Sequence, residues 1–107
     1  MEELNKLYEV IKQRKESPEE GSYTTYLFNK GKEKILKKIG EEATEVVISA
    51  LGNSKEEQVN ETCDLLYHVI VLLVQLNIPL DQIENELKNR TKKTHNLKEE
   101  RRSIESL

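Results

Sequence analysis

Cysteine, proline, glycine and aromatic residues are scarce in this chain of 107 residues, which has one cysteine, two prolines, four glycines, four tyrosines, one phenylalanine and no tryptophan. A single cysteine excludes a disulfide framework within the chain, and with only two histidines it leaves too few ligands for a usual structural zinc site. Few helix-breaking residues, together with abundant leucine, isoleucine, lysine and glutamate, predict helices throughout. We therefore expect an all-α protein.

Long apolar runs and a large charge imbalance are also absent. The longest apolar run, residues 69–74, is far too short to span a bilayer, and the start Met-Glu-Glu does not resemble a signal peptide. The net charge of -3 by itself indicates neither nucleic acid nor an anionic membrane as a partner. We expect a cytoplasmic protein with one domain, residues 1–107, that forms a homodimer or a higher homo-oligomer to bury more apolar surface.

Apolar periodicity and capping residues predict a bundle of four main helices and a short additional one. The expected ranges are residue 4 to just before Ser17, Ser22 to Phe28, about Lys32 to Leu51, Ser54 to Asn77, and Pro79 onward. The fourth of these is apolar nearly all round after Asp64, which predicts a central, buried helix. The last should start with Asp81 and Glu84 at capping spacing and bury a stripe of Leu80, Ile83 and Leu87, and the charged tail after His95 should fray.

Two acidic pairs lie on consecutive predicted helices, Glu42 with Glu45 and Glu61 with Asp64. A spacing of three places both carboxylates of a pair on one helical face, roughly 5 to 6 Å apart at Cβ. One such pair is usually an exposed face, but two pairs on an antiparallel hairpin would converge, and their repulsion is unfavourable without a cation. Ligands that are all oxygen predict a hard ion, Mg²⁺ or else Mn²⁺.

Lysines precede the acids on the same predicted helix. Those that we single out are Lys30, Lys32, Lys34, Lys37 and Lys38. Ammonium groups beside a metal site predict that the ligand carries phosphate, although lysines other than Lys38 are more often simply solvated. Arg90, Lys92 and Lys93 equally suit phosphate contacts or the dipole at the end of the last helix.

Three further residues have competing interpretations. His68 is predicted to be a packing residue with its hydrogen bonds satisfied rather than a side chain that orients a metal ligand. Cys63 is predicted to be a small buried apolar residue without reactivity. Gly40, in the middle of a helix, indicates close approach of another backbone or of a ligand, with a tolerated helical glycine as the alternative.

Three segments resemble those of the phosphoribosyl-ATP pyrophosphatase family: S-Y-T-T-Y-L-F at 22–28, K-K-I-G-E-E-A-T-E-V-V at 37–47 and E-T-C-D-L-L-Y-H at 61–68. The resemblance spans about residues 4–90. Its E-E-x-x-E and E-x-x-D motifs are shared with the wider MazG-like, all-α nucleoside triphosphate pyrophosphatases, whereas the other segments are typical of the histidine-pathway family. The resemblance implies Mg²⁺-dependent hydrolysis of the α-β phosphoanhydride of phosphoribosyl-ATP to phosphoribosyl-AMP and pyrophosphate, the second step of histidine biosynthesis.

The resemblance also implies residue roles. Metal ligands would be Glu42, Glu45, Glu61 and Asp64, with Glu41 orienting or deprotonating the attacking water and with Lys38 and Lys34 binding phosphates. The segment 22–28 would close over the nucleotide or the added ribose phosphate. The family also occurs fused to a cyclohydrolase, for which this chain has too few cysteines and histidines.

Two other functions remain open. A house-cleaning nucleoside triphosphate pyrophosphatase would use the same acids with a different base pocket, and a non-catalytic helical adaptor would carry them as a solvated face. A carboxylate di-iron bundle is excluded because it needs a Glu-x-x-His motif on each of two helices, and this sequence contains no such motif.

Overall fold

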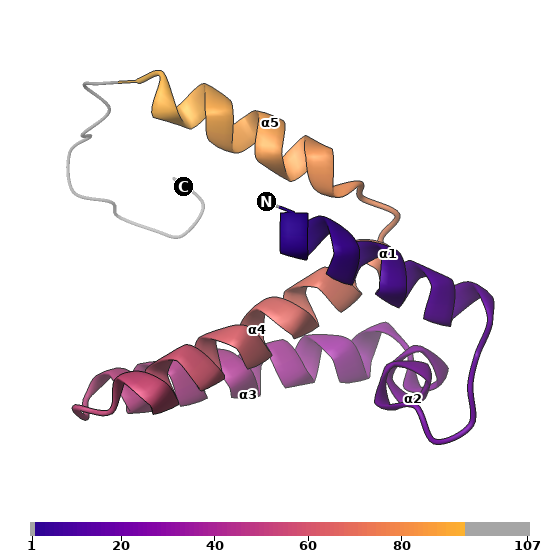
Figure 1. Ribbon diagram of the computed structural model, residues 1–107. Coiled ribbons are helices and arrows are strands. Elements are labelled where there is room, and N and C mark those ends of the chain that lie inside the picture. Colours follow the sequence, from indigo (N-terminus) through magenta and orange to yellow (C-terminus); the bar gives the residue numbers. More distant parts are fainter. Residues whose placement is uncertain (1, 94–107) are drawn as a thin grey trace.

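The computed structural model describes residues 2–93, which form five helices and no strand (Figure 1). They are α1 (Glu2–Glu16), α2 (Tyr23–Lys30), α3 (Lys32–Ala50), α4 (Lys55–Gln75) and α5 (Leu80–Thr91). The prediction of an all-α fold with four main helices and one short helix is therefore confirmed. The expectation for the tail after His95 lies outside the described residues.

Two serines begin helices as their sequence contexts predict. The hydroxyl oxygens of Ser22 and Ser54 each accept a hydrogen bond from the N–H three residues later, at 3.1 Å in both cases. The start of α5 differs from the prediction, since Pro79 is its N-cap and Asp81 lies inside the first turn. The side chain of proline has no hydrogen-bond acceptor, so no side-chain cap forms there.

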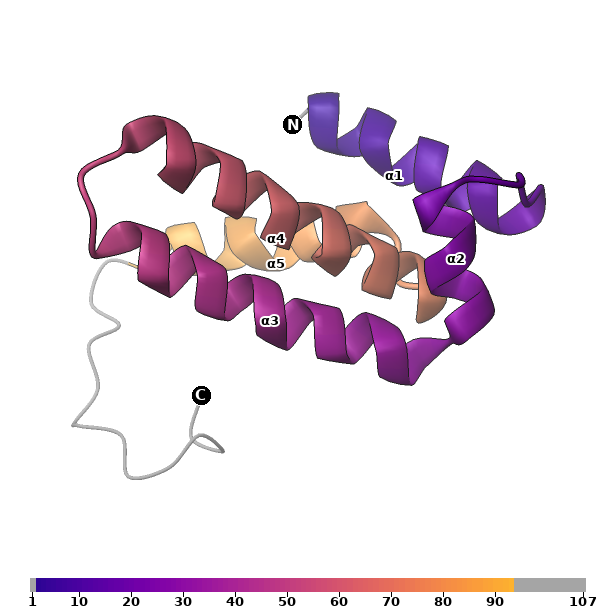
Figure 2. The ribbon, with the colours of Figure 1, turned by 90° about the horizontal axis from the view of Figure 1, so that it is seen from below.

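The helices α3 and α4 form an antiparallel hairpin that runs side by side in both views, with α2 across its end and α1 over α4 (Figures 1 and 2). The core lies where these four helices meet and comprises Ile11, Leu27, Ile35, Ile70, Val71, Leu73 and Val74. Four of the seven come from the second half of α4, so its predicted central position is confirmed. Burying each such side chain stabilises the fold by about 1.5 to 3 kcal/mol.

The last helix does not contribute the core stripe that its sequence predicts. It turns away from α4 at 114° and has no buried residue. Ile83 and Leu87 remain 38% and 55% exposed, and with Leu4 of α1 they line a hollow of about 120 Å³. Only Leu80 packs against the core. No single described helix is long and apolar enough to cross a membrane, and α4 and α5 reach that threshold only as a bent pair.

Candidate active site

The hairpin brings three predicted site residues together. Glu42 of α3 and Glu61 and Asp64 of α4 each place a carboxylate oxygen so that the three atoms lie within 4.8 Å of one another. They meet because the short turn after α3 folds the start of α4 back along the second half of α3 (Figure 2). Glu45 is exposed and lies outside this closest group.

The electrostatics of the cluster favour a cation. Desolvation, followed by the negative charges of Asp64, Glu45, Glu42 and Glu57, raises the pKa of Glu61 above its usual value. Glu45 is therefore within electrostatic reach although it is not in the closest group. Carboxylate oxygens that repel one another at this separation fit Mg²⁺ or Mn²⁺, which prefer all-oxygen sites.

Lys38 adjoins the cluster from one turn earlier on α3. Its Nζ lies 3.4 Å from one carboxylate oxygen of Glu41 and 3.4 Å from one of Glu42. Burial alone would lower the pKa of this ammonium, but Tyr23 and the two carboxylates outweigh burial and raise the pKa. Lys38 therefore stays positively charged beside the acids, and the partly exposed Lys34 precedes it by one further turn.

A buried histidine connects the cluster to α2. The Nδ1 of His68 lies 2.7 Å from the backbone carbonyl oxygen of Asp64, and its Nε2 lies 2.9 Å from the hydroxyl oxygen of Tyr23. Since a carbonyl oxygen can only accept, Nδ1 is the donor to Asp64, and both ring nitrogens have a hydrogen-bond partner. The prediction that His68 is a satisfied packing residue is confirmed. The sequence analysis did not single out Tyr23 as a residue near the site. Its place in the segment 22–28, which resembles the family, is the feature that could have indicated it.

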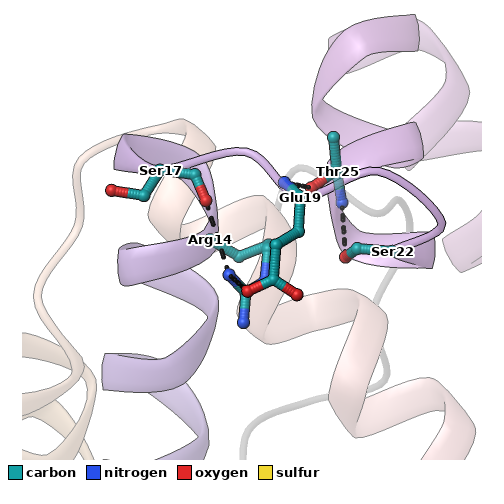
Figure 3. A network of polar contacts seen from close by, with 5 residues as sticks. All are labelled: Arg14, Ser17, Glu19, Ser22 and Thr25. Carbon is teal, nitrogen blue, oxygen red and sulfur yellow. Dashed lines mark hydrogen bonds and ion pairs between the residues drawn. The ribbon is translucent and has the colours of Figure 1, made fainter.

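The loop before α2 is held by its own polar network (Figure 3). Arg14 of α1 donates to the Ser17 carbonyl oxygen at 3.4 Å and to the Glu19 carboxylate at 2.7 Å. The N–H of Glu19 donates to the Thr25 hydroxyl at 3.0 Å, and Ser22 accepts from the Thr25 N–H. These bonds set the start of α2 and thereby the position of the tyrosine that follows Ser22.

Two predictions near the site are corrected or resolved. Cys63 is exposed rather than buried, because the first half of α4 is covered by α3 on one side only. A Cβ atom built at Gly40 would meet no atom within 4 Å outside its own stretch of helix, so no other backbone among residues 2–93 approaches it. Among the described residues Gly40 is therefore a tolerated helical glycine, and the approach of a ligand stays a prediction.

Fold and site together define a class: an all-α protein with a carboxylate cluster and an adjoining lysine, suited to a phosphorylated ligand. The family model described as phosphoribosyl-ATP pyrophosphohydrolase matches residues 4–91. The chain therefore belongs to the phosphoribosyl-ATP pyrophosphohydrolase family.

Similar proteins carry corresponding names. A phosphoribosyl-ATP pyrophosphatase of Clostridium acetobutylicum is 56% identical over 104 residues, which are 97% of this chain and 94% of that protein. One of Listeria monocytogenes is 66% identical over 87 residues, 81% of this chain and 84% of that protein. The histidine biosynthesis bifunctional protein HisIE of Caldanaerobacter subterraneus is 63% identical over 93 residues, 87% of this chain and 45% of that longer protein.

Proposed function

We propose that this protein hydrolyses the α-β phosphoanhydride of 1-(5-phosphoribosyl)-ATP, giving phosphoribosyl-AMP and pyrophosphate, the second step of histidine biosynthesis. Membership of the family supports this reaction. The observation that carries it is the convergence of Glu42, Glu61 and Asp64 from two facing helices, next to a charged lysine. We place the reaction in the cytoplasm and assign it to one domain, residues 1–107.

We infer Mg²⁺ as the cofactor, with Mn²⁺ as a substitute. Glu42, Glu61 and Asp64 would hold the cation, with Glu45 of the same helical face as the fourth ligand. When bound, the cation supplies positive charge that offsets the negative charge of the phosphate oxygens. The support is the set of ligand atoms itself. All of them are oxygens, and one of the carboxyl groups, that of Glu61, has a raised pKa.

The roles of the other residues follow from their positions. Lys38, and Lys34 one turn before it, would bind oxygens of the triphosphate. In the free protein the Lys38 ammonium is shared between Glu41 and Glu42. A phosphate that takes over Lys38 would release the Glu41 carboxylate, which is half exposed and outside the closest acidic group. Glu41 is then the group that orients the attacking water or accepts its proton.

We also propose a homodimer or a higher homo-oligomer. Large apolar side chains lie exposed along the hairpin and α5, among them Val47, Ile48, Leu51, Val59, Leu66, Leu76, Ile83 and Leu87. Leu51 is 85% exposed in the single chain. Covering such residues with a second copy would remove their contact with water. Sedimentation velocity measures the resulting mass, and a monomer at all concentrations would refute this part.

The reaction is tested by measuring pyrophosphate release from phosphoribosyl-ATP with Mg²⁺, alongside ATP and deoxynucleoside triphosphates. We expect turnover of phosphoribosyl-ATP alone, and a loss of about 100-fold or more in Glu42→Gln, the size seen when a group stabilising developing charge is removed. Glu56→Gln is the matched control, because Glu56 is an exposed acid of α4 outside the cluster.

The alternatives give other outcomes. Preferred turnover of an ordinary or modified nucleotide would indicate a house-cleaning enzyme with the same acids. No metal-dependent hydrolysis of any of these compounds, with equal behaviour of Glu42→Gln and the wild type, would favour the helical adaptor.

A further inference from the structure

Three of the four tyrosines form one group of rings that is linked through His68 to the backbone of Asp64 in the carboxylate cluster. The ring of Tyr23 is nearly parallel to those of Tyr26 and Tyr67, with centroid distances of 5.9 and 6.1 Å and interplanar angles of 22° and 29°. Tyr67, on α4, is partly buried, whereas Tyr23 and Tyr26, on α2, are 44% and 41% exposed. The three rings form a ladder that leads from the core of the protein to its surface.

Polar contacts hold this ladder in place. The Tyr23 hydroxyl is hydrogen-bonded to Nε2 of the buried His68, and the hydroxyls of Thr24 and Tyr67 are hydrogen-bonded to each other. The imidazole also lies edge-on to the rings of Tyr23 and Tyr67, with centroid distances of 5.7 and 4.9 Å. An exposed aromatic surface that is already fixed loses little conformational freedom when a ligand binds to it.

The two ends of the ladder face different surroundings. On the inner side, the hydroxyl of Tyr23, the middle ring, bonds His68, which bonds the carbonyl oxygen of Asp64, and this hydroxyl is close enough to Lys38 and Glu42 for their charges to act on it. At the outer end, Tyr23, Tyr26 and Lys30 help to line an open groove of about 750 Å³. That volume is in the range of sites for small organic ligands.

We propose that Tyr23 and Tyr26 form the platform on which the purine base of the nucleotide stacks while its phosphates reach Lys38 and the carboxylate cluster. Every nucleobase has a flat π-face, and aromatic side chains are the usual partners of an unpaired base. Solvated lysines and acids cannot supply such a surface. Among the described residues, Tyr23 and Tyr26 are the two exposed tyrosines beside the cluster. That the ligand is an adenine nucleotide rests on the proposed function.

Lys30 adds a second contact to this site. Its Nζ lies 5.8 Å from the centroid of the Tyr26 ring in the free protein. An exposed cation–π contact is weaker than the stacking of a base on an aromatic ring, so the base displaces the ammonium. The freed ammonium is then available to a phosphate group of the same ligand.

The platform is tested by calorimetric titration with two probes in Mg²⁺, α,β-methylene-ATP, which resists cleavage at the α-β position, and inorganic triphosphate, which has no base. The proteins are the wild type, Tyr26→Ala and the matched control Tyr26→Phe, which keeps the ring. We expect Tyr26→Ala to weaken binding of the methylene analogue by roughly 5- to 100-fold, the range for loss of one base–aromatic stack. Triphosphate binding should be unchanged, and Tyr26→Phe should match the wild type.

Several results would overturn the platform. They are an equal loss for both probes, no loss in Tyr26→Ala, a loss in Tyr26→Phe as large as in Tyr26→Ala, or a wild type that binds triphosphate as tightly as the analogue. A change of mass in Tyr26→Ala by sedimentation velocity would also overturn it, because a second copy would then cover the ring. Turnover is not part of the readout, so stacking without pyrophosphate release would refute the proposed function alone.

Discussion

The two halves of α4 differ sharply although they belong to one continuous helix. The first half, Lys55–Asp64, has no buried residue and carries Glu61 and Asp64 of the carboxylate cluster. The second half, up to Gln75, holds five buried residues, four of them core aliphatics. The core therefore covers only part of the helix, and the candidate active site lies where this cover ends.

This division separates stability from chemistry. Where α1, α2 and α3 surround α4, apolar side chains are removed from water and stabilise the fold. Where α3 alone faces it, carboxylates can gather with access to water and to a ligand. His68 lies at the boundary, because its ring is buried among the tyrosines while its Nδ1 bonds the carbonyl oxygen of Asp64.

The largest effect on stability is expected in the buried half. Ile70 is 3% exposed, and Ile70→Ala should lower the free energy of unfolding by about 2 to 5 kcal/mol through lost burial and the cavity left behind. Leu66, one turn earlier and 42% exposed, is the comparison: Leu66→Ala should cost less than about 1 kcal/mol in a monomer and more where a second copy covers Leu66, as proposed above. Urea denaturation measures both values, and equal losses would mean that another surface covers Leu66.

A smaller effect is expected at Gly40, on α3 beside the acids. Among residues 2–93, no atom outside the adjacent helix backbone lies within 4 Å of a Cβ built there, so Gly40→Ala should raise the free energy of unfolding by about 1 kcal/mol, the difference between the two residues inside a helix. The comparison of denaturation midpoints tests this. If Gly40→Ala instead destabilises the protein, a second copy or a ligand packs against α3 at this point. The region around the acids would then be more covered than it is in the single chain.

The smallest effect is expected from the repulsion within the polar half. The raised pKa of Glu61 means that the folded protein binds this proton more readily than the unfolded chain, so the ionised form costs stability. Glu61→Gln should therefore raise the melting temperature at about pH 7 without Mg²⁺, and the gain should vanish near pH 4, where the carboxyl is largely protonated in both states.

Adding and removing Mg²⁺ extends the comparison of melting temperatures between the wild type and Glu61→Gln. Mg²⁺ should raise the melting temperature of the wild type, since a ligand that binds only the folded state stabilises it, and should raise that of Glu61→Gln less. Chelation with EDTA should reverse the gain. If Glu61→Gln is less stable than the wild type without metal at neutral pH, the proposed repulsion is contradicted. Glu56→Gln is the control for the general change in charge.

Much of the fold was predictable because its signals are local. Ser22 and Ser54 accept backbone hydrogen bonds within their own first turns, so capping could be recognised from residues three positions apart. The apolar half of α4 likewise indicates its central position. For the site, the spacing of Glu61 and Asp64 predicted a shared face, and the short turn between α3 and α4 was enough to predict that Glu42 would meet them.

The predictions that were wrong depended on contacts that no local pattern describes. The stripe of α5 has helical spacing, yet the 114° bend after α4 directs Ile83 and Leu87 away from the core. Cys63 belongs to an apolar residue type but lies on an uncovered side of α4. The bond between Tyr23 and His68 joins residues 45 positions apart, and nothing near either residue indicates it.

The sequence by itself determined the all-α class, the helix starts at Ser22 and Ser54, and the family, because helical period, capping and motif spacing act within a few residues. Only the tertiary structure decided which acids form the closest group, where α5 points, and how the tyrosines of α2 meet α4. These features depend on the angles at which whole helices pack, which result from burying side chains distant in the chain against one another.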